Sequence, residues 1–453
     1  MKQASKSRRG QIFSIAMPVF IELLMGTLFG MVDMIMIGNS GTGAVITESI
    51  AAIGITNQYM FIGLSLVSAL TTGATAMIAR YIGAKREDKI ESVVRHILLL
   101  SMLFLAIPIA VFGITNTDMI MRFIGAEADA IQTGRAYFRV IMAGFIFQAF
   151  NFAVFASMRG AADTKSPMRI NMAVNLLNVV GNAILIFGLL GFPRLGVTGA
   201  GISTAFAQVV AFVLCLRYLL RGKHHVKLTG KEPFRLDKNV LYNLVIIGVP
   251  AAVEQVLFRV GILLYVRTVA GLGTAVYATH QLSLNILSLS FTIGQAFGTA
   301  ASTLVGRSLG EEDPELASDY MRETRRYGVY FSLIVAVLFF FFSKHVVRLY
   351  TGDPQIITLA SGVLRMIAVI QPFQAAQFIL AGGLRGAGDT RFTLISTGVG
   401  VLVVRNVFAW ILVLMRGMGL TGAWIALMID QLIRWILITY RVRSEKWKHI
   451  QLR

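Results

Sequence analysis

The chain has 453 residues, of which 56% are hydrophobic and 14% are charged. A soluble protein has about a quarter of its residues charged, so this composition excludes an ordinary soluble protein and indicates one that lies in a membrane. The formal net charge of +19 raises the question of a nucleic-acid partner, and the answer depends on where the basic residues lie.

Apolar runs of the about 20 residues that a membrane-spanning helix needs recur along the whole chain and leave no room for a separate soluble domain. We therefore predict an all-α membrane protein with twelve transmembrane helices. They are expected at residues 12–38, 49–79, 92–114, 133–158, 168–191, 196–220, 241–270, 275–305, 327–344, 360–383, 393–415 and 419–440.

Basic residues concentrate at the two ends of the chain and in every second connection between the predicted helices. By the positive-inside rule, this alternation places both termini in the cytoplasm and requires an even number of spans. The charge is therefore a topology signal. The expected partner is the lipid bilayer, and no nucleic-acid partner is expected.

A six-residue motif occurs twice, as Arg159-Gly-Ala-Ala-Asp163-Thr and, 226 residues later, as Arg385-Gly-Ala-Gly-Asp389-Thr. Three further matches occur in the same order at offsets between 223 and 232: Pro18-x-x-x-Glu22 with Pro250-x-x-x-Glu254, Arg80-Tyr-Ile-Gly83 with Arg307-Ser-Leu-Gly310, and Gly196-Val-Thr-Gly199 with Gly419-Leu-Thr-Gly422. The chain is therefore predicted to be a tandem duplication of a six-helix unit.

Because six is an even number, the two units enter the membrane in the same orientation, and a pseudo-two-fold axis along the membrane normal should relate them. We predict an N-lobe at 1–220, a basic cytoplasmic linker at 221–240 and a C-lobe at 241–453. The linker contains His224-His225, which lacks Cys or acidic partners at ligand spacing. We expect two solvated loop residues there and no metal site.

The duplicated motif falls at the cytoplasmic ends of the fourth and tenth predicted helices. Its glycine permits a tight turn, and Asp163 and Asp389 can cap the helices that follow. Arg159 and Arg385 are expected near the last carbonyls of the preceding helices, where the macrodipole favours a cation. The motif is predicted to have a structural or gating role rather than to contact substrate.

Ionisable residues inside predicted membrane helices are costly, at about 2.5–3.5 kcal/mol each, and need a reason. Glu22 and Asp33 are eleven residues apart and share one face of the first helix. They form either a cation path or a pair of carboxyls that hydrogen-bond neighbouring helices, and both readings stay open for Glu22. For Asp33 a function is favoured, because the matching position in the second repeat is Tyr265.

Asp430 and Arg434 are four residues apart on one helix and are expected to neutralise each other. Arg259 and Arg405 are predicted to pair with acidic groups of the second bundle. Glu22, Glu254 and Asp430 remain candidate carboxylates for protons or substrate. The fifth helix contains Asn171, Asn175, Asn178 and Asn182, whose amides serve either as cation ligands or as contacts between helices.

In its duplicated motifs, in Pro18…Asp33…Gly38, and in Ala278-Thr-His-Gln281, the chain resembles the multidrug and toxic compound extrusion (MATE) transporters over essentially its whole length. The resemblance implies a multi-pass protein of the bacterial inner membrane. It also implies twelve helices in two lobes, and a secondary antiporter that exports amphipathic, often cationic, drugs or metabolites in exchange for H⁺ or Na⁺. Carried over to this sequence, the family's N-lobe cation site falls on Asp33, Asn178, Asn182 and Thr204.

The chain departs from both bacterial branches of that family. In the DinF-like branch the position of Asn182 holds an aspartate. In the NorM-like branch the C-lobe carboxylates fall near Phe258 and Gln374, and here both are missing. Glu254, one turn before Phe258, is a candidate substitute. The coupling ion therefore stays open between H⁺ and Na⁺.

We expect export by alternating access of the two lobes, with Asp33 taking up the cation and releasing it. No phosphate-binding Gly-x-x-x-x-Gly-Lys-(Ser/Thr) motif occurs, and no cofactor is expected. The protein is expected to be a monomer whose other partners are small organic substrates. The alternatives are a lipid-linked oligosaccharide flippase, which needs a strongly cationic cavity, and a membrane-embedded enzyme, for which the sequence offers no set of convergent catalytic groups.

Overall fold

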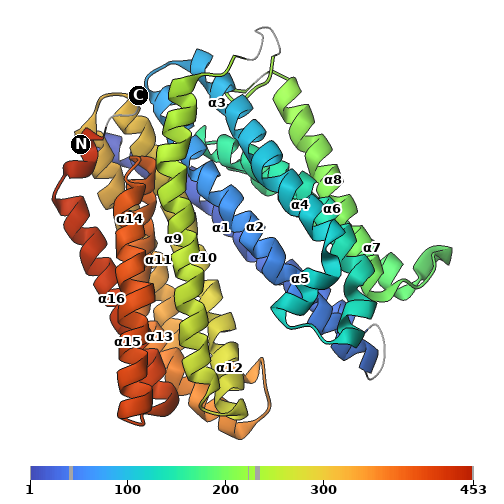
Figure 1. Ribbon diagram of the computed structural model, residues 1–453. Helices are drawn as coiled ribbons and strands as arrows, with labels where there is room; N and C mark the ends of the chain where they lie inside the picture. Colours follow the sequence, from blue (N-terminus) through green and yellow to red (C-terminus); the bar gives the residue numbers. More distant parts are fainter. Residues whose placement is uncertain (1, 40–43, 223, 230–234, 451–453) are drawn as a thin grey trace. The chain divides into compact units, whose positions relative to one another are not determined.

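The computed structural model describes residues 2–39, 44–222, 224–229 and 235–450, and every regular element among them is helical (Figure 1). A helix or an unbroken series of helical segments covers each of the twelve predicted spans. Their bounds are α1 Lys2–Gly38, α2 Ala44–Gly83, α3 to α4 Glu87–Thr115, α6 Ala128–Gly160, α7 Lys165–Phe187, α8 Gly196–Leu220, α9 Lys238–Ala270, α10 Thr274–Gly310, α11 Pro314–Phe341, α13 Pro354–Gly386, α14 to η4 Thr390–Met415 and α16 Gly419–Arg443.

Eleven of these described segments are long and apolar enough to cross a membrane by length and composition. The twelfth predicted span corresponds to α10, which has 37 residues but includes several polar ones, among them Gln281 and Asn285. Two short helices stand between spans, α5 at Thr117–Ile124 and α12 at Ser343–Arg348. The predicted all-helical membrane fold is confirmed.

Two of the spans contain π-helical turns. One is η1, Leu100–Ala106, between α3 (Glu87–Leu99) and α4 (Ile107–Thr115). The other span contains η3, Gly398–Val404, and η4, Trp410–Met415, on either side of the short α15, Arg405–Ala409. In Figure 1, α14 (Thr390–Thr397) and α15 follow one another along a single rod. Wider π turns re-aim side chains within a continuous helix and are frequent at functional sites.

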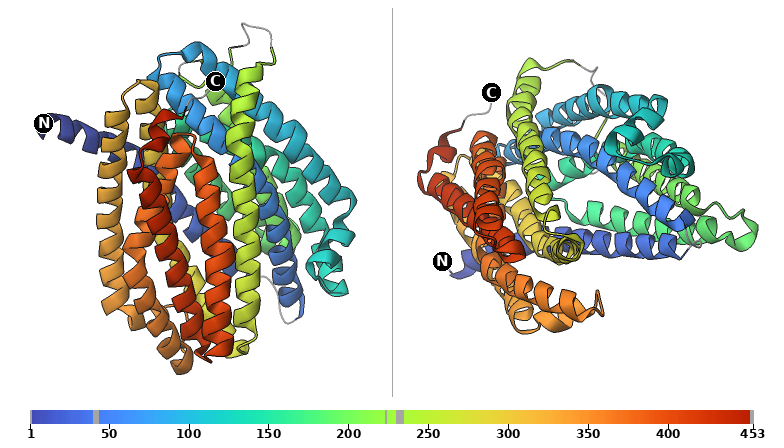
Figure 2. Two further views of the ribbon diagram at one scale, coloured as in Figure 1. Left: turned by 60° about the vertical axis from the view of Figure 1, so that its left-hand side comes forward. Right: turned by 60° about the horizontal axis from the view of Figure 1, so that its bottom comes forward.

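The chain forms two compact units, which are described separately. Unit 1 contains residues 1–20, 79–85 and 246–453, and unit 2 contains residues 21–78 and 86–245. Helices α9 to α16 of unit 1 run side by side along most of their length in both views of Figure 2. The predicted lobe boundaries, at residues 220 and 241, stay a prediction, and residues 223 and 230–234 of the predicted linker lie outside the described part of the chain.

The glycine of the duplicated motif has a different role from the expected one. Gly160 and Gly386 are the last residues of α6 and α13, and they lie where another helix comes very close. A Cβ added to Gly160 would stand 2.8 Å from the carbonyl oxygen of Thr75 in α2. The turn depends instead on the residue two positions later, since Ala162 and Gly388 have φ angles of 62° and 88°. The motif therefore combines a close helix contact with a left-handed turn.

The close contact at Gly386 gives a test of the packing. A Cβ there would stand 2.1 Å from the carbonyl oxygen of Ser302, whereas one at Gly362, on the same helix, would meet nothing within 4 Å. We expect Gly386→Ala to destabilise the protein by about 1–3 kcal/mol, the usual effect of overpacking. Gly362→Ala is the matched control and should be neutral or slightly stabilising. Thermal unfolding of both purified variants measures the difference, and equal midpoints would contradict the packing argument.

Candidate cation site

Asp33 lies on α1 of unit 2 and is bound by side chains of α7. The amide nitrogen of Asn182 donates a hydrogen bond to Asp33 Oδ1 over 2.8 Å. Asn178, one turn earlier on α7, has its amide nitrogen 3.2 Å from Asp33 Oδ2, and its oxygen accepts from the hydroxyl of Thr204 on α8 at 3.1 Å. This amide orientation pairs every donor with an acceptor. The four residues predicted as a cation site thus lie together.

The two carboxylates of α1 meet two amides of α7 in the same register. Asn171 donates to Glu22 over 2.5 Å, and Asn182 donates to Asp33. Both pairs are 149 residues apart in the sequence, because eleven residues separate the members of each helix. Eleven residues are almost three complete turns, so each helix presents one polar stripe to the other. The predicted shared face of Glu22 and Asp33 is confirmed.

The surroundings of Asp33 leave room for a ligand. Asn182 is 1% exposed, yet its side-chain oxygen has no hydrogen-bond partner among the described residues. A buried amide oxygen without a partner costs about 1–3 kcal/mol unless a water or an ion satisfies it. A carboxylate with amide and hydroxyl oxygens can hold a proton or a hard cation such as Na⁺.

Tyr137 is a further residue of the site, and the sequence reasoning missed it. It comes from α6, is buried, and lies close enough to Asp33 for the two charges to interact. Its ring packs against Gly201 of α8, where a Cβ would stand 2.8 Å from the ring atom Cδ2. One of thirty phenylalanines and twelve tyrosines in an apolar chain carries no distinguishing signal in the sequence.

Glu22 and Glu254 each form an ion pair with the arginine of the duplicated motif. Arg159 Nη2 lies 2.6 Å from Glu22, and Arg385 Nη2 lies 2.6 Å from Glu254. Thr393 and Thr397 also donate to Glu254, at 2.8 and 3.0 Å. The expectation that the arginines lie at the last carbonyls of their own helices is corrected, since a buried carboxylate attracts a guanidinium more strongly than a helix end does.

The two acids of the motif also have separate partners. Asp163 accepts from the backbone N–H of Ser166 at 3.0 Å, which caps the start of α7 as predicted, and from the hydroxyl of Tyr218 at 2.8 Å. Asp389 instead pairs with Arg441 Nε at 2.6 Å, and no capping bond from its side chain is present in the described residues. The predicted capping role therefore holds for the first copy alone.

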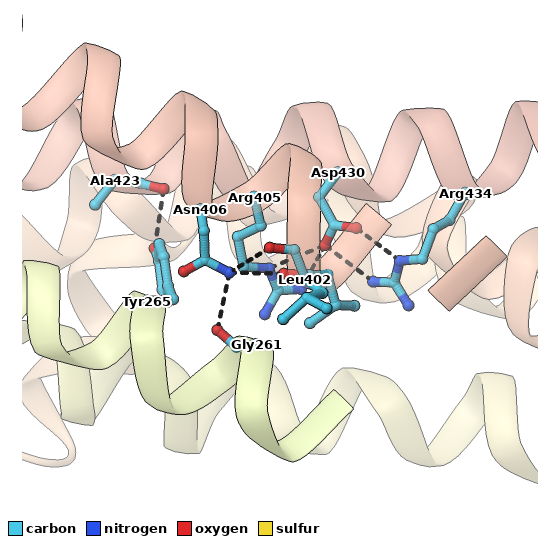
Figure 3. A network of polar contacts seen from close by, with 9 residues as sticks. Gly261, Tyr265, Leu402, Arg405, Asn406, Ala423, Asp430 and Arg434 are labelled. Carbon is cyan, nitrogen blue, oxygen red and sulfur yellow. Dashed lines mark hydrogen bonds and ion pairs between the residues drawn. The ribbon is translucent and has the colours of Figure 1, made fainter. Parts of the chain in front are cut away.

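Unit 1 contains a buried ionic network that Figure 3 shows from close by. Asp430 is fully buried and lies 2.5 Å from Arg405 Nη2 and 2.8 Å from Arg434 Nε. The predicted internal pair of Asp430 and Arg434 and the predicted acidic partner of Arg405 are both confirmed. Arg259 lies exposed on α9, and its predicted acidic partner stays a prediction.

The matching positions of unit 1 lack the chemistry of the cation site. Tyr265, the counterpart of Asp33, is 1% exposed and donates to the carbonyl of Ala423 over 2.9 Å. At the offset of 226 that relates the two motifs, Asn178 and Asn182 correspond to Val404 and Phe408, and at the offset of 223 that relates Gly199 to Gly422, Thr204 corresponds to Leu427. The candidate site therefore exists in one repeat only.

Two polar residues of unit 1 are buried without polar partners among the described residues. Gln374, at the position of the absent NorM-like carboxylate, is 2% exposed, and neither of its amide atoms is hydrogen-bonded. His280 is fully buried, and both its ring nitrogens lack partners. Its ring contacts Tyr265 and Trp424 at centroid distances of 5.5 Å, as expected of a packing residue.

Twelve helical segments, an internal duplication and a buried acid in one repeat define a multi-pass membrane transporter. The MatE family model matches residues 18–184 and 250–411. The chain belongs to the multidrug and toxic compound extrusion (MATE) family. Its members are transporters, so the prediction that the protein is not an enzyme is confirmed.

Individual relatives support this assignment. The chain is 31% identical to the multidrug resistance protein NorM of Vibrio cholerae, with 95% of this chain and 96% of that one covered. It is 28% identical to a probable multidrug resistance protein NorM of Thermotoga maritima, with 97% and 93% covered. Among solved structures, an outward-facing multidrug resistance MATE family transporter of the MOP superfamily matches with a TM-score of 0.88 at 24% identity, covering 97% of each chain.

Proposed function

We propose that this transporter is a secondary antiporter that exports amphipathic, cationic drugs or metabolites in exchange for H⁺ or Na⁺. The observation that carries the proposal is Asp33, a half-buried carboxylate held by Asn178 and Asn182 beside an unpartnered amide oxygen. The names of the NorM relatives support drugs as cargo. We further propose a monomer in a bacterial inner membrane with both termini in the cytoplasm, as the basic connections indicate.

Two occupancies of Asp33 provide the coupling. When the carboxylate holds a cation, it needs fewer donors from α7. When it is empty, it is stabilised by the amides of Asn178 and Asn182. Occupancy thus biases the contact of α1 with α7 between two packings, and a ligand shifts such an equilibrium by its difference in affinity for the two states.

The other buried carboxylates fit a structural role better. Glu254 has hydrogen-bond donors on both oxygens, and Asp430 lies between two guanidiniums. An additional cation has no free oxygen at either residue. Glu22 differs, because its Oε2 is buried without a partner among the described residues, so it stays a candidate for a second proton position.

The test uses everted membrane vesicles that contain the protein and an amphipathic fluorescent cation. A proton gradient in Na⁺-free buffer and a Na⁺ gradient at constant pH are imposed in separate experiments. We expect dye accumulation that exceeds that of vesicles without the protein under at least one gradient, and its collapse when that gradient is dissipated. If the native protein accumulates no dye above the control under either gradient while it binds the dye, coupled export is wrong.

A further inference from the structure

The duplication continues beyond the last helix of each repeat. The offset of 223 that relates Gly199 to Gly422 also relates Gly222 to Glu445, and both have left-handed φ angles, 64° and 57°. After this turn, each segment folds back on the helix that precedes it. Leu228 N donates to Leu219 O over 3.0 Å, and Trp447 Nε1 donates to Val442 O over 3.0 Å. We name residues 224–229 the first hook and residues 447–450 the second hook.

The accepting carbonyls are themselves equivalent, because 219 plus 223 is 442. Each hook also has a fully or almost fully buried side chain, Val226 in the first and Trp447 in the second. The expectation that His224 and His225 are merely solvated loop residues is therefore corrected. The hooks are ordered parts of the two repeats, and the sequence offset of the last helices predicts their correspondence.

Each hook lies beside the acid of the duplicated motif. Tyr218, near the end of α8, donates to Asp163, and its counterpart Arg441, near the end of α16, pairs with Asp389. The ring of His224 stacks on Tyr218 at a centroid distance of 4.3 Å and an interplanar angle of 7°. The turn after the motif, the last helix of the repeat and the hook thus form one connected assembly in each unit.

Each hook is also tied to a carboxylate in the first turn of the third helix of its repeat. His225 Nδ1 lies 2.9 Å from Glu87 in α3, and Lys448 Nζ lies 2.9 Å from Glu315 in α11. The two bases occupy equivalent positions, because 225 plus 223 is 448. The same contact is therefore made by a histidine in one repeat and by a lysine in the other.

This difference has a chemical consequence. Histidine is the side chain whose charge changes near neutral pH, whereas a lysine in an ion pair stays charged. Partial burial works to lower the pKa of Lys448, but its hydrogen bonds to Glu315 and Glu445 outweigh this effect and raise that pKa above the ordinary value. The second hook is thus held by a permanent charge.

We propose that the first hook is a proton-sensitive clasp, which fastens the motif turn and α8 to α3 through His225 and Glu87 at the end of the unit that faces the cytoplasm. The second hook is its pH-independent counterpart. The clasp depends on neither the cargo nor the coupling ion. It closes more tightly as the pH falls, because a protonated His225 pairs with the carboxylate of Glu87, and the contact weakens as the pH rises and that charge is lost.

The other charged and titratable groups that face His225 favour the same direction or stay constant. They line a cavity of about 380 Å³ whose walls include Glu87, Asp163, Tyr218, His224, His225 and Lys227. Both carboxylates attract a protonated histidine. Protonation of His224 over the ring of Tyr218 adds a cation–π attraction. Glu91 of α3 is occupied by Thr229, which donates its backbone N–H and its hydroxyl over 3.0 and 2.7 Å, so it anchors the hook at either pH.

Hydrogen exchange of the full-length protein in nanodiscs tests the clasp. The backbone amides of Leu228 and Thr229 report on docking, since their acceptors are Leu219 O and Glu91. After correction for the intrinsic exchange rate, we expect their protection at pH 6 to exceed that at pH 8 by up to about fivefold, the range of an exposed ion pair. The amides of the second hook should show no such change.

His225→Lys supplies a permanent charge at a position that is half exposed, and folding should tolerate it. We expect this variant to lose more than half of the pH dependence and to keep the higher protection at both pH values. His225→Gln should show the lower protection at both. Equal protection of the native first hook at pH 6 and pH 8, an equal change in the second hook, or undiminished pH dependence in His225→Lys would each overturn the proposal.

Discussion

Asp33→Asn is expected to abolish coupling to both the Na⁺ and the proton gradient while the protein still folds and binds cargo. Asparagine has almost the same shape as aspartate, and its oxygen can still accept from the Asn182 amide, which now donates to Asp33 over 2.8 Å. It cannot take up a charge. Entry of one positive charge across 100 mV supplies about 2.3 kcal/mol, so the variant should lose a cargo gradient of about fiftyfold.

The measurement is dye accumulation in everted vesicles under separately imposed gradients, with dye binding as the check on folding. Asp33→Glu is the matched control, because it keeps the charge and should retain part of the coupling. Asn182→Asp should also retain coupling, since it restores the acid found at that position in the DinF-like branch. If Asp33→Asn accumulates dye as steeply as the native protein under either gradient, Asp33 is not the coupling site.

Much of this site could be predicted from the sequence, because polar residues in membrane helices are few and a duplication supplies its own control. The spacing of Glu22 and Asp33 already placed them on one face of α1. Their match with Asn171 and Asn182 repeats the same eleven-residue spacing on α7. What placed Asp33 apart from the other acids was the absence of an equivalent in the second repeat, where Tyr265 bonds a backbone carbonyl.

Contacts that depend on the packing of helices distant in the sequence could not be predicted in the same way. The partner of Arg159 is Glu22, 137 residues away, and nothing local in either segment specifies it. The motif glycine was assigned to a turn, whereas Gly160 permits α2 and α6 to approach closely. Tyr137 entered the site for the same reason, since its position against Gly201 depends on how α6 packs on α8.

The buried network of unit 1 carries a net positive charge. Arg385 pairs with Glu254, Arg405 and Arg434 pair with Asp430, and Glu254 is close enough to Arg434 to attract it. Three guanidiniums and two carboxylates leave an excess of one positive charge. All members but Arg385 are at most 5% exposed, so solvent screens this charge poorly.

This excess predicts unequal effects for two substitutions in the network. Asp430→Asn leaves Arg405 and Arg434 side by side without a counter-ion, and removing one partner of a buried pair costs about 3–5 kcal/mol. Arg434→Met replaces the arginine with an apolar side chain and leaves two neutral pairs, Arg405 with Asp430 and Arg385 with Glu254. Its cost should therefore be clearly smaller.

Thermal unfolding of the two purified variants gives the comparison, with dye binding as evidence that each still folds below its midpoint. We expect the midpoint of Asp430→Asn to fall well below that of Arg434→Met. If Arg434→Met is destabilised as much as Asp430→Asn, the packing of the arginine stem against Gly400, where a Cβ would stand 2.4 Å from Arg434 Cγ, outweighs charge balance in this network. The network would then stabilise the unit through its shape rather than through its electrostatics.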